Sequence, residues 1–317
     1  MALILTSFTA TLVALAKIAL VIGVAAWMVH RKIFNEAHTR ALTAVVVNLA
    51  LPCLVFSNVI KCFDVSDFPH WWKFPLIGAA LCLIPLLLAR LVFNRAGSAR
   101  NTLIALSGLQ NAGYLVLPVG EMLFPEQFEQ FSIYIFLMLL AYMPILWSVG
   151  TFLISHREGM KLELRKIMPP PFCVNVLAMI LVFTGLDRFI PEIILEPVEL
   201  VGTACVPLAT VVLGLTMGAL HVRRLPRPAF LAGVVGIKLL VVPTAMFFLL
   251  KYTGFSSGSL ENAFWIIEAA SPPATALVLQ MIHFGGDEKL VCGTLVTAYL
   301  AALFTMPLFL SLVQVLL

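Results

Sequence analysis

Two stretches decide the fold: residues 101–124, NTLIALSGLQNAGYLVLPVGEMLF, and residues 261–284, ENAFWIIEAASPPATALVLQMIHF. Each is an apolar run long enough to cross a membrane, since about 20 helical residues span a hydrocarbon core of ~30 Å. Each also carries, near its middle, residues that a helix interior disfavours. Unwound backbone at membrane depth survives only when it is buried in protein or lines a watery cavity. The two stretches therefore predict a membrane protein with an internal site.

The first interruption consists of Gln110, Asn111 and Gly113, and the second is the proline pair Pro272 and Pro273. Two consecutive prolines remove two backbone donors, and proline is well suited to the first position of a new helix. We therefore expect two half-helices in each stretch, with the second halves beginning near Gly113 and near Pro272. The N-termini of such half-helices carry partial positive charge and free amide donors, which favour an anion.

The alternative is a pair of kinks that bind no ligand. For either stretch alone, a kink explains the residues as well as a binding site does. Interrupted helices at corresponding places in two halves of a chain are typical of transporter binding sites. The occurrence of both interruptions at matching positions therefore favours the site.

The composition excludes a soluble protein. Of the 317 residues, 61% are hydrophobic and 11% are charged, and the mean hydropathy is +1.04. A soluble domain carries about 25% charged residues. Residues 1–16 hold no Lys or Arg, so we expect no cleaved signal peptide. Ten apolar runs are predicted to span as helices: 8–29, 39–60, 73–93, 101–124, 129–155, 170–186, 197–220, 228–250, 261–284 and 291–316.

The basic residues of the loops set the expected orientation. Lys and Arg are enriched in cytoplasmic loops. One side holds fourteen of them: Arg31, Lys32, Arg40, Arg90, Arg95, Arg100, Arg157, Lys161, Arg165, Lys166, Arg223, Arg224, Arg227 and Lys289. The other side holds four: Lys61, Lys73, Arg188 and Lys251. This asymmetry places both termini outside the cytoplasm, and an even number of spans separately requires that the termini lie on the same side. We expect a multi-pass protein of the bacterial inner (plasma) membrane.

The hydrophilic loop at residues 156–170 divides the chain into two halves, 1–155 and 156–317, each with five expected spans. Because five is odd, the halves have opposite orientations, which is the geometry of an inverted repeat. We therefore predict an all-α membrane protein of ten transmembrane helices in two inverted five-helix repeats, with discontinuous crossover helices 4 and 9. Prolines mark further structural breaks within the spans: Pro52, Pro118, Pro207 and Pro243.

Three ionisable residues lie deep inside spans: Lys17, Lys238 and Glu268. Each costs about 2.5–3.5 kcal/mol or more in a membrane, so such residues usually mark function. Lys238 and Glu268 are interpreted either as an ion pair inside the bundle or as a coupling site in which Glu268 binds a proton. Lys17 either extends toward the interface or lines the cavity.

The predicted substrate-binding residues surround the two interruptions: Gln110, Asn111, Gly113, Tyr114, Ser271, Pro272, Pro273 and Thr275. Further polar residues in the spans are candidates to surround a shared cavity, although each is more often a hydrogen-bonding partner between helices than a ligand contact: Asn48, Asn58, Ser107, Asn175, Thr203 and Gln280, with Tyr114. The six cysteines form no CxxC pair, so we expect neither a metal site nor a disulfide framework. The sequence contains no catalytic motif such as HExxH or GxSxG, so we expect no enzyme and no catalytic residue. Nothing suggests a nucleic-acid partner.

Four motifs, in this order, give a resemblance to a known family: LPCLVF at 51–56, QNAGYLVLP at 110–118, KLLVVP at 238–243 and SPPATALVL at 271–279. The chain resembles the auxin efflux carrier family, in its bacterial branch, over essentially its whole length. The resemblance implies a fold shared with sodium–bile acid symporters, in which helices 4 and 9 cross to form the substrate site. Helices 1, 2, 6 and 7 would form a scaffold, and helices 3–5 and 8–10 a transport core that moves like an elevator.

The resemblance also implies site residues and a substrate class. The crossover positions that match the family are Asn111, Gly113, Pro118, Pro272 and Pro273, with Lys238 from the eighth span. Members carry organic anions such as auxin, or dicarboxylates such as malonate and malate, and plant relatives are dimers, so a homodimer is an open expectation. The chain departs from the family at Ala276, where many bacterial members have Asn, and at the first crossover, which lacks the proline of plant carriers.

The leading prediction is a secondary transporter of small organic anions that works with membrane lipid around it and without a cofactor. A Na⁺- or H⁺-coupled importer is the nearest alternative. A membrane-embedded enzyme or a sensor is a distant one, since neither a catalytic motif nor a soluble signalling domain is present.

Overall fold

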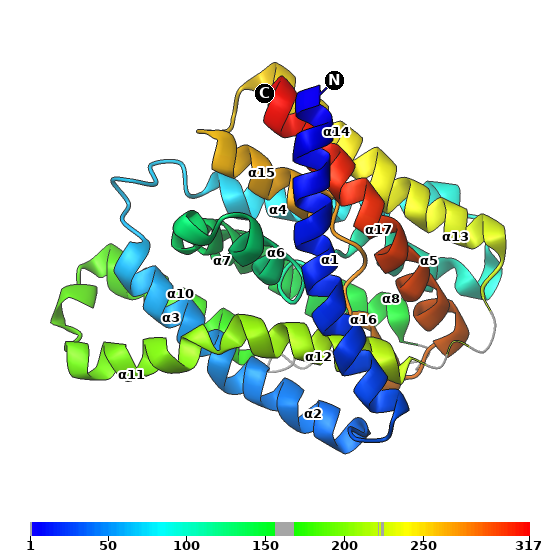
Figure 1. Ribbon diagram of the computed structural model, residues 1–317, viewed down its shortest axis with the longest axis horizontal. Helices are drawn as coiled ribbons and strands as arrows, with labels where there is room; N and C mark the ends of the chain where they lie inside the picture. Colours follow the sequence, from blue (N-terminus) through cyan, green and yellow to red (C-terminus); the bar gives the residue numbers. More distant parts are fainter. Residues whose placement is uncertain (1, 156–167, 221, 223–224) are drawn as a thin grey trace.

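The computed structural model describes residues 2–155, 168–220, 222 and 225–317, and the regular elements in them are helices (Figure 1). In chain order they are α1 (Ala2–His30), α2 (Glu36–Val45), α3 (Leu51–Cys62), α4 (Lys73–Val92), α5 (Arg100–Gly108), α6 (Val116–Leu123), α7 (Phe128–Ile145), α8 (Thr151–Ile154), α10 (Pro170–Thr184), α11 (Glu192–Thr203), α12 (Cys205–Ala219), α13 (Pro228–Val235), α14 (Val242–Thr253), α15 (Ser259–Ala269), α16 (Ala276–Phe284) and α17 (Glu288–Leu316). Short π-helical segments join three pairs of them: η1 (Val46–Ala50), η4 (Leu146–Gly150) and η6 (Gly236–Val241).

Within the described residues, seven helical stretches are long and apolar enough to cross a membrane: Ile4–His30, Glu36–Cys62, Lys73–Val92, Pro125–Ile154, Glu192–Ala219, Pro228–Thr253 and Glu288–Leu316. The expected span at 170–186 holds α10, a shorter apolar helix. The two remaining expected spans are the interrupted ones, and each holds two short helices. The chain is therefore an all-helical, multi-pass integral membrane protein, while the number of ten crossings stays a prediction.

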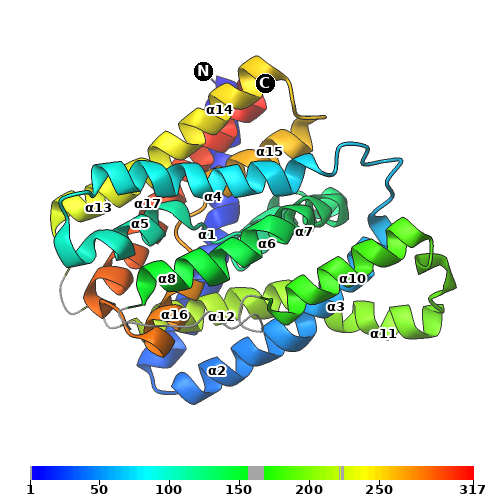
Figure 2. The same cartoon turned by 180° about the vertical axis from the view of Figure 1, so that it is seen from behind.

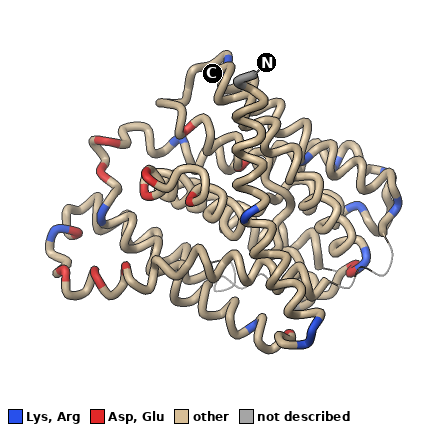
Figure 3. Tube along the Cα trace, viewed as in Figure 1, with Lys and Arg blue, Asp and Glu red and all other residues tan. Residues whose placement is uncertain are grey.

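Part of the charge argument falls outside the described residues, namely Arg157, Lys161, Arg165, Lys166, Arg223 and Arg224. The boundary between the two expected halves, after residue 155, also lies at the edge of the described chain. Over the described chain, Figure 3 shows acidic residues gathered toward one end of the molecule and a group of Lys and Arg toward the opposite end. This polarity agrees with the charge asymmetry of the loops.

The helices form two groups, visible from both sides in Figures 1 and 2. One group contains α2, α3, α10, α11 and α12, with α3 packed against α10 and α11. The other contains α4, α5, α13, α14, α15 and α17, with α4 packed against α5 and α15 against α17. Helix α7 contacts both α3 and α4 and so lies between the groups. Helix α6, the second half of the first interrupted stretch, contacts both α7 and α12.

Helix α1 packs along α12 and α17. Its contact with α12 is close because α12 presents glycines there. A Cβ on Gly218 would lie 2.6 Å from the Cα of Ala26, and one on Gly214 would lie 2.6 Å from the Cβ of Ala25. Small residues let membrane helices approach until their backbones pack, which is how such helices associate without a hydrophobic driving force.

An aromatic cluster fills the space between α4, α7 and α15. Phe74 stacks on Tyr134 at 4.9 Å and on Trp265 at 5.3 Å between ring centroids. Beside it, the buried Lys73 Nζ lies 2.8 Å from a carboxylate oxygen of Glu261. Aromatic pairs of this kind and a buried ion pair hold these three helices in fixed relative positions.

The two ends of the chain lie side by side (Figure 1). The Ser7 hydroxyl of α1 donates to the Gln314 side chain of α17. Termini at one end of the molecule are consistent with an even number of crossings.

Candidate functional site

The two interrupted helices meet at their breaks. The backbone N–H of Asn111 donates to the carbonyl of Pro272 at 2.8 Å, and the N–H of Ala274 donates to the carbonyl of Leu109 at 2.9 Å. The two segments thus form a short antiparallel pair around Gln110 and Pro273. This pairing satisfies backbone groups that lost their helical partners, which is the condition for unwound chain at membrane depth.

The second half-helices begin later than the sequence suggested. We expected them near Gly113 and near Pro272, but α6 begins at Val116 and α16 at Ala276. Helix α16 starts a few residues after Pro272 because a proline also suits an extended segment, where its missing N–H costs nothing. Both prolines lie in the segment that pairs with the first break.

Side chains add to this backbone pairing. The Ser271 hydroxyl donates to the carbonyl of Asn111 at 3.1 Å. The Asn111 amide donates to the hydroxyl of Tyr299 on α17, which also interacts with the Thr275 side chain. Tyr299 is therefore held to both breaks at once, and it fixes the position of the Asn111 amide.

Gln110 lies at the centre of the pairing and is fully buried. Its carbonyl accepts a hydrogen bond from the Tyr142 hydroxyl of α7. Its side-chain oxygen accepts a weak hydrogen bond from the Cys82 thiol of α4, with 3.7 Å between sulfur and oxygen. Its amide nitrogen has no hydrogen-bond partner among the described residues and faces the carboxylate of Glu268. Gln110 thus links the break to α4, α7 and α15.

A cavity of about 310 Å³ adjoins the paired breaks. We call it the crossover cavity. It is lined by residues just before the starts of both second half-helices, among them Gln110, Asn111, Gly113, Tyr114, Ala274 and Ala276. Its other walls come from η1 and α3, α7 and η4, the start of α10, and α12. Most of these wall residues are apolar, and of the described lining residues one, Arg40, is charged.

Two features suit the crossover cavity to a small ligand. The hydroxyl of Tyr114, one of the residues that line the cavity, is buried without a hydrogen-bond partner among the described residues. A Cβ added at Gly113 would meet nothing within 4 Å, so the cavity is open at this residue. Its volume lies at the lower end of the ~300–1,000 Å³ of ligand pockets.

Lys238 and Glu268 are both fully buried, on η6 and at the end of α15. They lie close enough to interact electrostatically, together with Cys82. Neither the Lys238 ammonium nor either Glu268 oxygen has a hydrogen-bond partner among the described residues. A buried charge without such partners is costly. Neither residue lines the crossover cavity; Gln110 connects them to it.

The structure therefore brings the eight predicted substrate residues together, in two roles. Four line the cavity: Gln110, Asn111, Gly113 and Tyr114. The other four belong to the second break and contact the first break or Tyr299: Ser271, Pro272, Pro273 and Thr275.

Lys17 is not part of this cluster, because it lies on the exposed face of α1. The predicted structural breaks lie apart from one another. Pro52 and Pro243 each stand in the first turn of a helix that follows a π-helical segment, Pro207 in the first turn of α12 and Pro118 within α6.

Three of the other polar residues form the expected contacts between helices, whereas the hydroxyls of Ser107 and Thr203 donate to carbonyls of their own helices. The Asn58 amide donates to Ser132 at 2.9 Å, the Asn175 amide to the Phe136 carbonyl at 2.6 Å and the Gln280 amide to the Leu146 carbonyl at 2.9 Å. Asn48 differs from them, because it lines the crossover cavity while its amide bonds to its own helix.

Sequence reasoning missed Tyr142 and Tyr299. Both are tyrosines within largely apolar helices, where the sequence alone does not distinguish a functional Tyr from an ordinary core residue. It also counted Arg40 only as a loop charge. Among the described residues, no group of three or more His, Cys, Asp and Glu side chains is arranged to hold a metal ion.

Comparison with known proteins gives one family. A family model described as membrane transport protein matches residues 10–163 and 156–310. The two matched segments together cover most of the chain and include both interrupted helices.

Two archaeal proteins are similar along nearly their whole lengths. An uncharacterized transporter of Methanocaldococcus jannaschii is 26% identical over 276 residues, covering 83% of this chain and 86% of the relative. An uncharacterized transporter of Methanothermobacter thermautotrophicus is 27% identical over 294 residues, covering 87% of this chain and 89% of the relative.

Proposed function

Because this chain belongs to the membrane transport protein family, we propose that it is a carrier of small organic anions and binds them in the crossover cavity. Membership of this family makes it a secondary transporter, and the transporters to which it is similar extend over the same length. The substrate and the mechanism are our inference from the site.

The observation that carries the proposal is the convergence of two helix N-termini on one cavity. Residues immediately before or at the starts of α6 and α16 line it, including Gly113, Tyr114 and Ala276. Helix N-termini offer backbone N–H groups and a partial positive charge, which stabilise an anion at that position. The unpartnered Tyr114 hydroxyl adds a donor suited to a carboxylate oxygen.

The walls favour an anion with one carboxylate and an apolar body, as in auxin-like monocarboxylates. Trp147, Leu139 and Leu117 are among the apolar residues that line the crossover cavity. A dicarboxylate such as malonate or malate would place a second charge against such walls, which costs free energy without a polar partner. Monocarboxylates are therefore our first candidates and dicarboxylates our second.

We propose an elevator motion for transport. The scaffold would comprise α1, α2–α3, α10 and α11–α12, and the transport core the remaining helices, as two inverted five-helix repeats divided near residue 155. The crossover cavity supports this division, since α3 and α12 line one side of it and the paired breaks the other. A core that slides as a body would carry the paired breaks and their ligand past the scaffold.

The buried Lys238–Glu268 pair favours a second candidate function, namely cation-coupled import. A fully buried carboxylate without a hydrogen-bond partner among the described residues is a candidate proton or Na⁺ site. In that case the gradient of the cation, and not the membrane potential, would drive the anion.

The membrane potential gives the expected direction for an uncoupled carrier. We place both termini on the non-cytoplasmic side of the plasma membrane. A membrane potential that is negative inside the cell favours the exit of a monoanion by about 2.3 kcal/mol per 100 mV, whichever way the protein is oriented. Net efflux is the expected result without a cation gradient.

Transport in proteoliposomes tests the proposal. Uptake of labelled indole-3-acetate and of labelled malonate would be followed separately, with and without a Na⁺ gradient, a pH gradient and an imposed potential. Counterflow exchange of the same labels separates a carrier from a sensor, because a sensor exchanges nothing.

We expect uptake of indole-3-acetate that responds to the imposed potential alone. Uptake that requires a Na⁺ or pH gradient would replace the uncoupled carrier with the coupled importer. Folded protein that exchanges neither anion under any gradient would refute the organic-anion assignment.

A further inference from the structure

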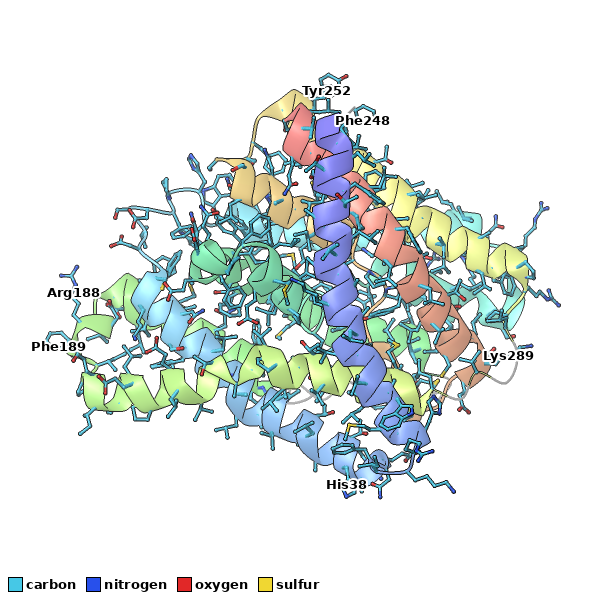
Figure 4. The ribbon with its side chains drawn as sticks, in the orientation of Figure 1. His38, Arg188, Phe189, Phe248, Tyr252 and Lys289 are labelled. Carbon is cyan, nitrogen blue, oxygen red and sulfur yellow. The ribbon has the colours of Figure 1, made fainter. Side chains whose placement is uncertain are left out.

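A second cavity, of about 410 Å³, lies beside the crossover cavity. We call it the vestibule. It is bounded by α2 and the end of α12 on one side and by α16 and the start of α17 on the other. Figure 4 labels His38 on α2 and Lys289 near the start of α17, two residues that project outward from the elements flanking the vestibule.

The vestibule and the crossover cavity share part of their lining. Arg40, Thr43 and Leu279 line both. The two cavities are therefore neighbours that meet at α2 and α16. Together they form a path from the exposed first turn of α2 to the buried Gln110 beside the paired breaks.

One wall of this path is a polar stripe along α2. Glu36, Thr39, Arg40 and Thr43 line the vestibule and follow the three- and four-residue spacing of one helix face. The stripe continues at Asn48, which lines the crossover cavity. A polar stripe of this kind on a membrane helix marks a face turned toward water or a polar ligand.

Arg40 stands at the point where the two cavities meet, and it is the one charged residue among the described residues that line the crossover cavity. Its side chain is 73% exposed, and the nearest carboxylate oxygen, from Glu36, is 4.0 Å away. An exposed ion pair at that separation is weak, so the guanidinium remains available to another anion. Glu36 and Glu288 are the other two charged residues of the described vestibule lining.

We propose that Arg40 is the anion-capture residue of this carrier, the group that draws a carboxylate out of the vestibule and into the crossover cavity. The inference rests on the proposed function, because it names the residue that gives that site its charge selectivity. Glu36 and Glu288 also line the vestibule, and because their charge is negative they repel the anion and limit how long it stays beside Arg40. The guanidinium suits the role because its fork of N–H donors matches a carboxylate.

Capture at the mouth predicts a distinct kinetic signature. A charge that steers a ligand changes the rate of encounter and its dependence on salt more than it changes the later steps. Because the Debye length falls from ~30 Å at 0.01 M salt to ~10 Å at 0.1 M, raising the ionic strength should weaken capture by wild-type protein. A purely structural role for Arg40 would lower the activity without altering the salt dependence.

The test compares Arg40→Gln, Arg40→Lys and Glu36→Gln in proteoliposomes, with indole-3-acetate as the probe and KM and kcat measured between low and moderate salt. Arg31→Gln is the matched control. Arg31 is an exposed cation directly after the last residue of α1, and it lines neither cavity. Calorimetric titration of the detergent-solubilised proteins with indole-3-acetate gives a readout that does not depend on transport.

We expect Arg40→Gln to raise KM about fivefold and to keep kcat within about twofold of the wild-type value. A whole charged cleft raises the association rate of its ligand by about 10- to 10³-fold, and one charge accounts for a part of that. The salt dependence of KM should disappear in this variant. Arg40→Lys should keep most of the wild-type behaviour, Glu36→Gln should lower KM, and Arg31→Gln should change neither quantity.

Two results would overturn the inference in different ways. Wild-type protein that transports and binds the anion, with Arg40→Gln showing the same KM and salt dependence, removes Arg40 from capture and leaves the carrier intact. Wild-type protein that neither binds nor transports indole-3-acetate or malonate removes the proposed function, and the inference with it.

Discussion

The backbone of Asn111 is bonded to the backbone of Pro272, a residue 161 positions later in the chain, through an N–H to carbonyl hydrogen bond of 2.8 Å. This bond and its neighbour between Ala274 and Leu109 hold two interrupted helices against each other at the wall of one cavity. Each helix supplies the partners that the other lacks. The breaks should therefore be stable only as a pair.

Replacing Asn111 with Ala should weaken anion binding. The side chain of Asn111 lines the crossover cavity and is fixed by the Tyr299 hydroxyl, so its loss removes a polar contact and leaves Tyr299 without that partner. The expected loss of affinity is at least about fivefold, since a buried polar group left unpaired costs about 1–3 kcal/mol. Titration with indole-3-acetate measures it.

The control for this variant is Asn58→Ala. The Asn58 amide bonds to Ser132 between helices and does not line the crossover cavity, so its removal should lower the unfolding temperature and leave affinity unchanged. Equal losses of affinity in the two variants would show that Asn111 acts through stability alone.

Replacing both Pro272 and Pro273 with Ala should stop transport while the protein keeps its helical content. The substitution restores two backbone donors and lets α15 continue toward α16, which competes with the pairing to Leu109 and Asn111. Circular dichroism should show equal or greater helicity, and counterflow should fall to background. Pro307→Ala, in the middle of α17 and outside the crossover cavity, is the control and should transport normally. Normal counterflow in the double variant would contradict the role given to the breaks.

The places of the breaks were predictable from the sequence. Prolines and an Asn next to Gly stand out in an apolar run, because each removes or weakens a helical hydrogen bond. Gln110, Asn111 and the two prolines therefore identified the interrupted segments. The exact starts of α6 and α16 were not predictable in this way, since Pro272 and Pro273 fit an extended segment as well as a helix start.

The partners of the breaks could not be predicted. Tyr299 holds Asn111 and Tyr142 holds Gln110, but each lies in an apolar helix where it carries no distinguishing pattern. Lys17 is a different case. Its depth in the first span left two alternatives, extension toward the interface or lining of the cavity. The exposed position of the side chain on α1 disfavours the second, since a charge in a helix has a direction as well as a depth.

Removing either member of the Lys238–Glu268 pair should destabilise the protein more than removing both. Each residue is fully buried, so a single substitution leaves an uncompensated charge, which costs about 3–5 kcal/mol. Lys238→Met and Glu268→Gln should each lower the unfolding temperature, and the double variant should recover most of the loss. If Glu268 binds the coupling proton, Glu268→Gln should also abolish any dependence of transport on pH.

The half-exposed pair between Lys61 and Glu199 provides the comparison for this cycle. Exposed pairs contribute about 0–1 kcal/mol, so Lys61→Met should change the unfolding temperature little. A double variant of Lys238 and Glu268 that is no more stable than the single variants would mean that the two residues act independently.

Replacing Ala276 with Asn should shift the preference of the carrier from monocarboxylates toward dicarboxylates. Ala276 begins α16 and lines the crossover cavity, so an amide there adds donors for a second carboxylate in a largely apolar wall. A net hydrogen bond to a charged group contributes about 1.5–3 kcal/mol, which corresponds to at least about a tenfold gain for malonate relative to indole-3-acetate. Competition between the two labelled anions in proteoliposomes measures the ratio. Ala276→Leu adds volume without donors and should weaken transport of both anions. If the ratio of malonate to indole-3-acetate transport stays constant in both variants, the substrate does not bind at the start of α16. A ligand held at that helix N-terminus must contact the side chain at position 276.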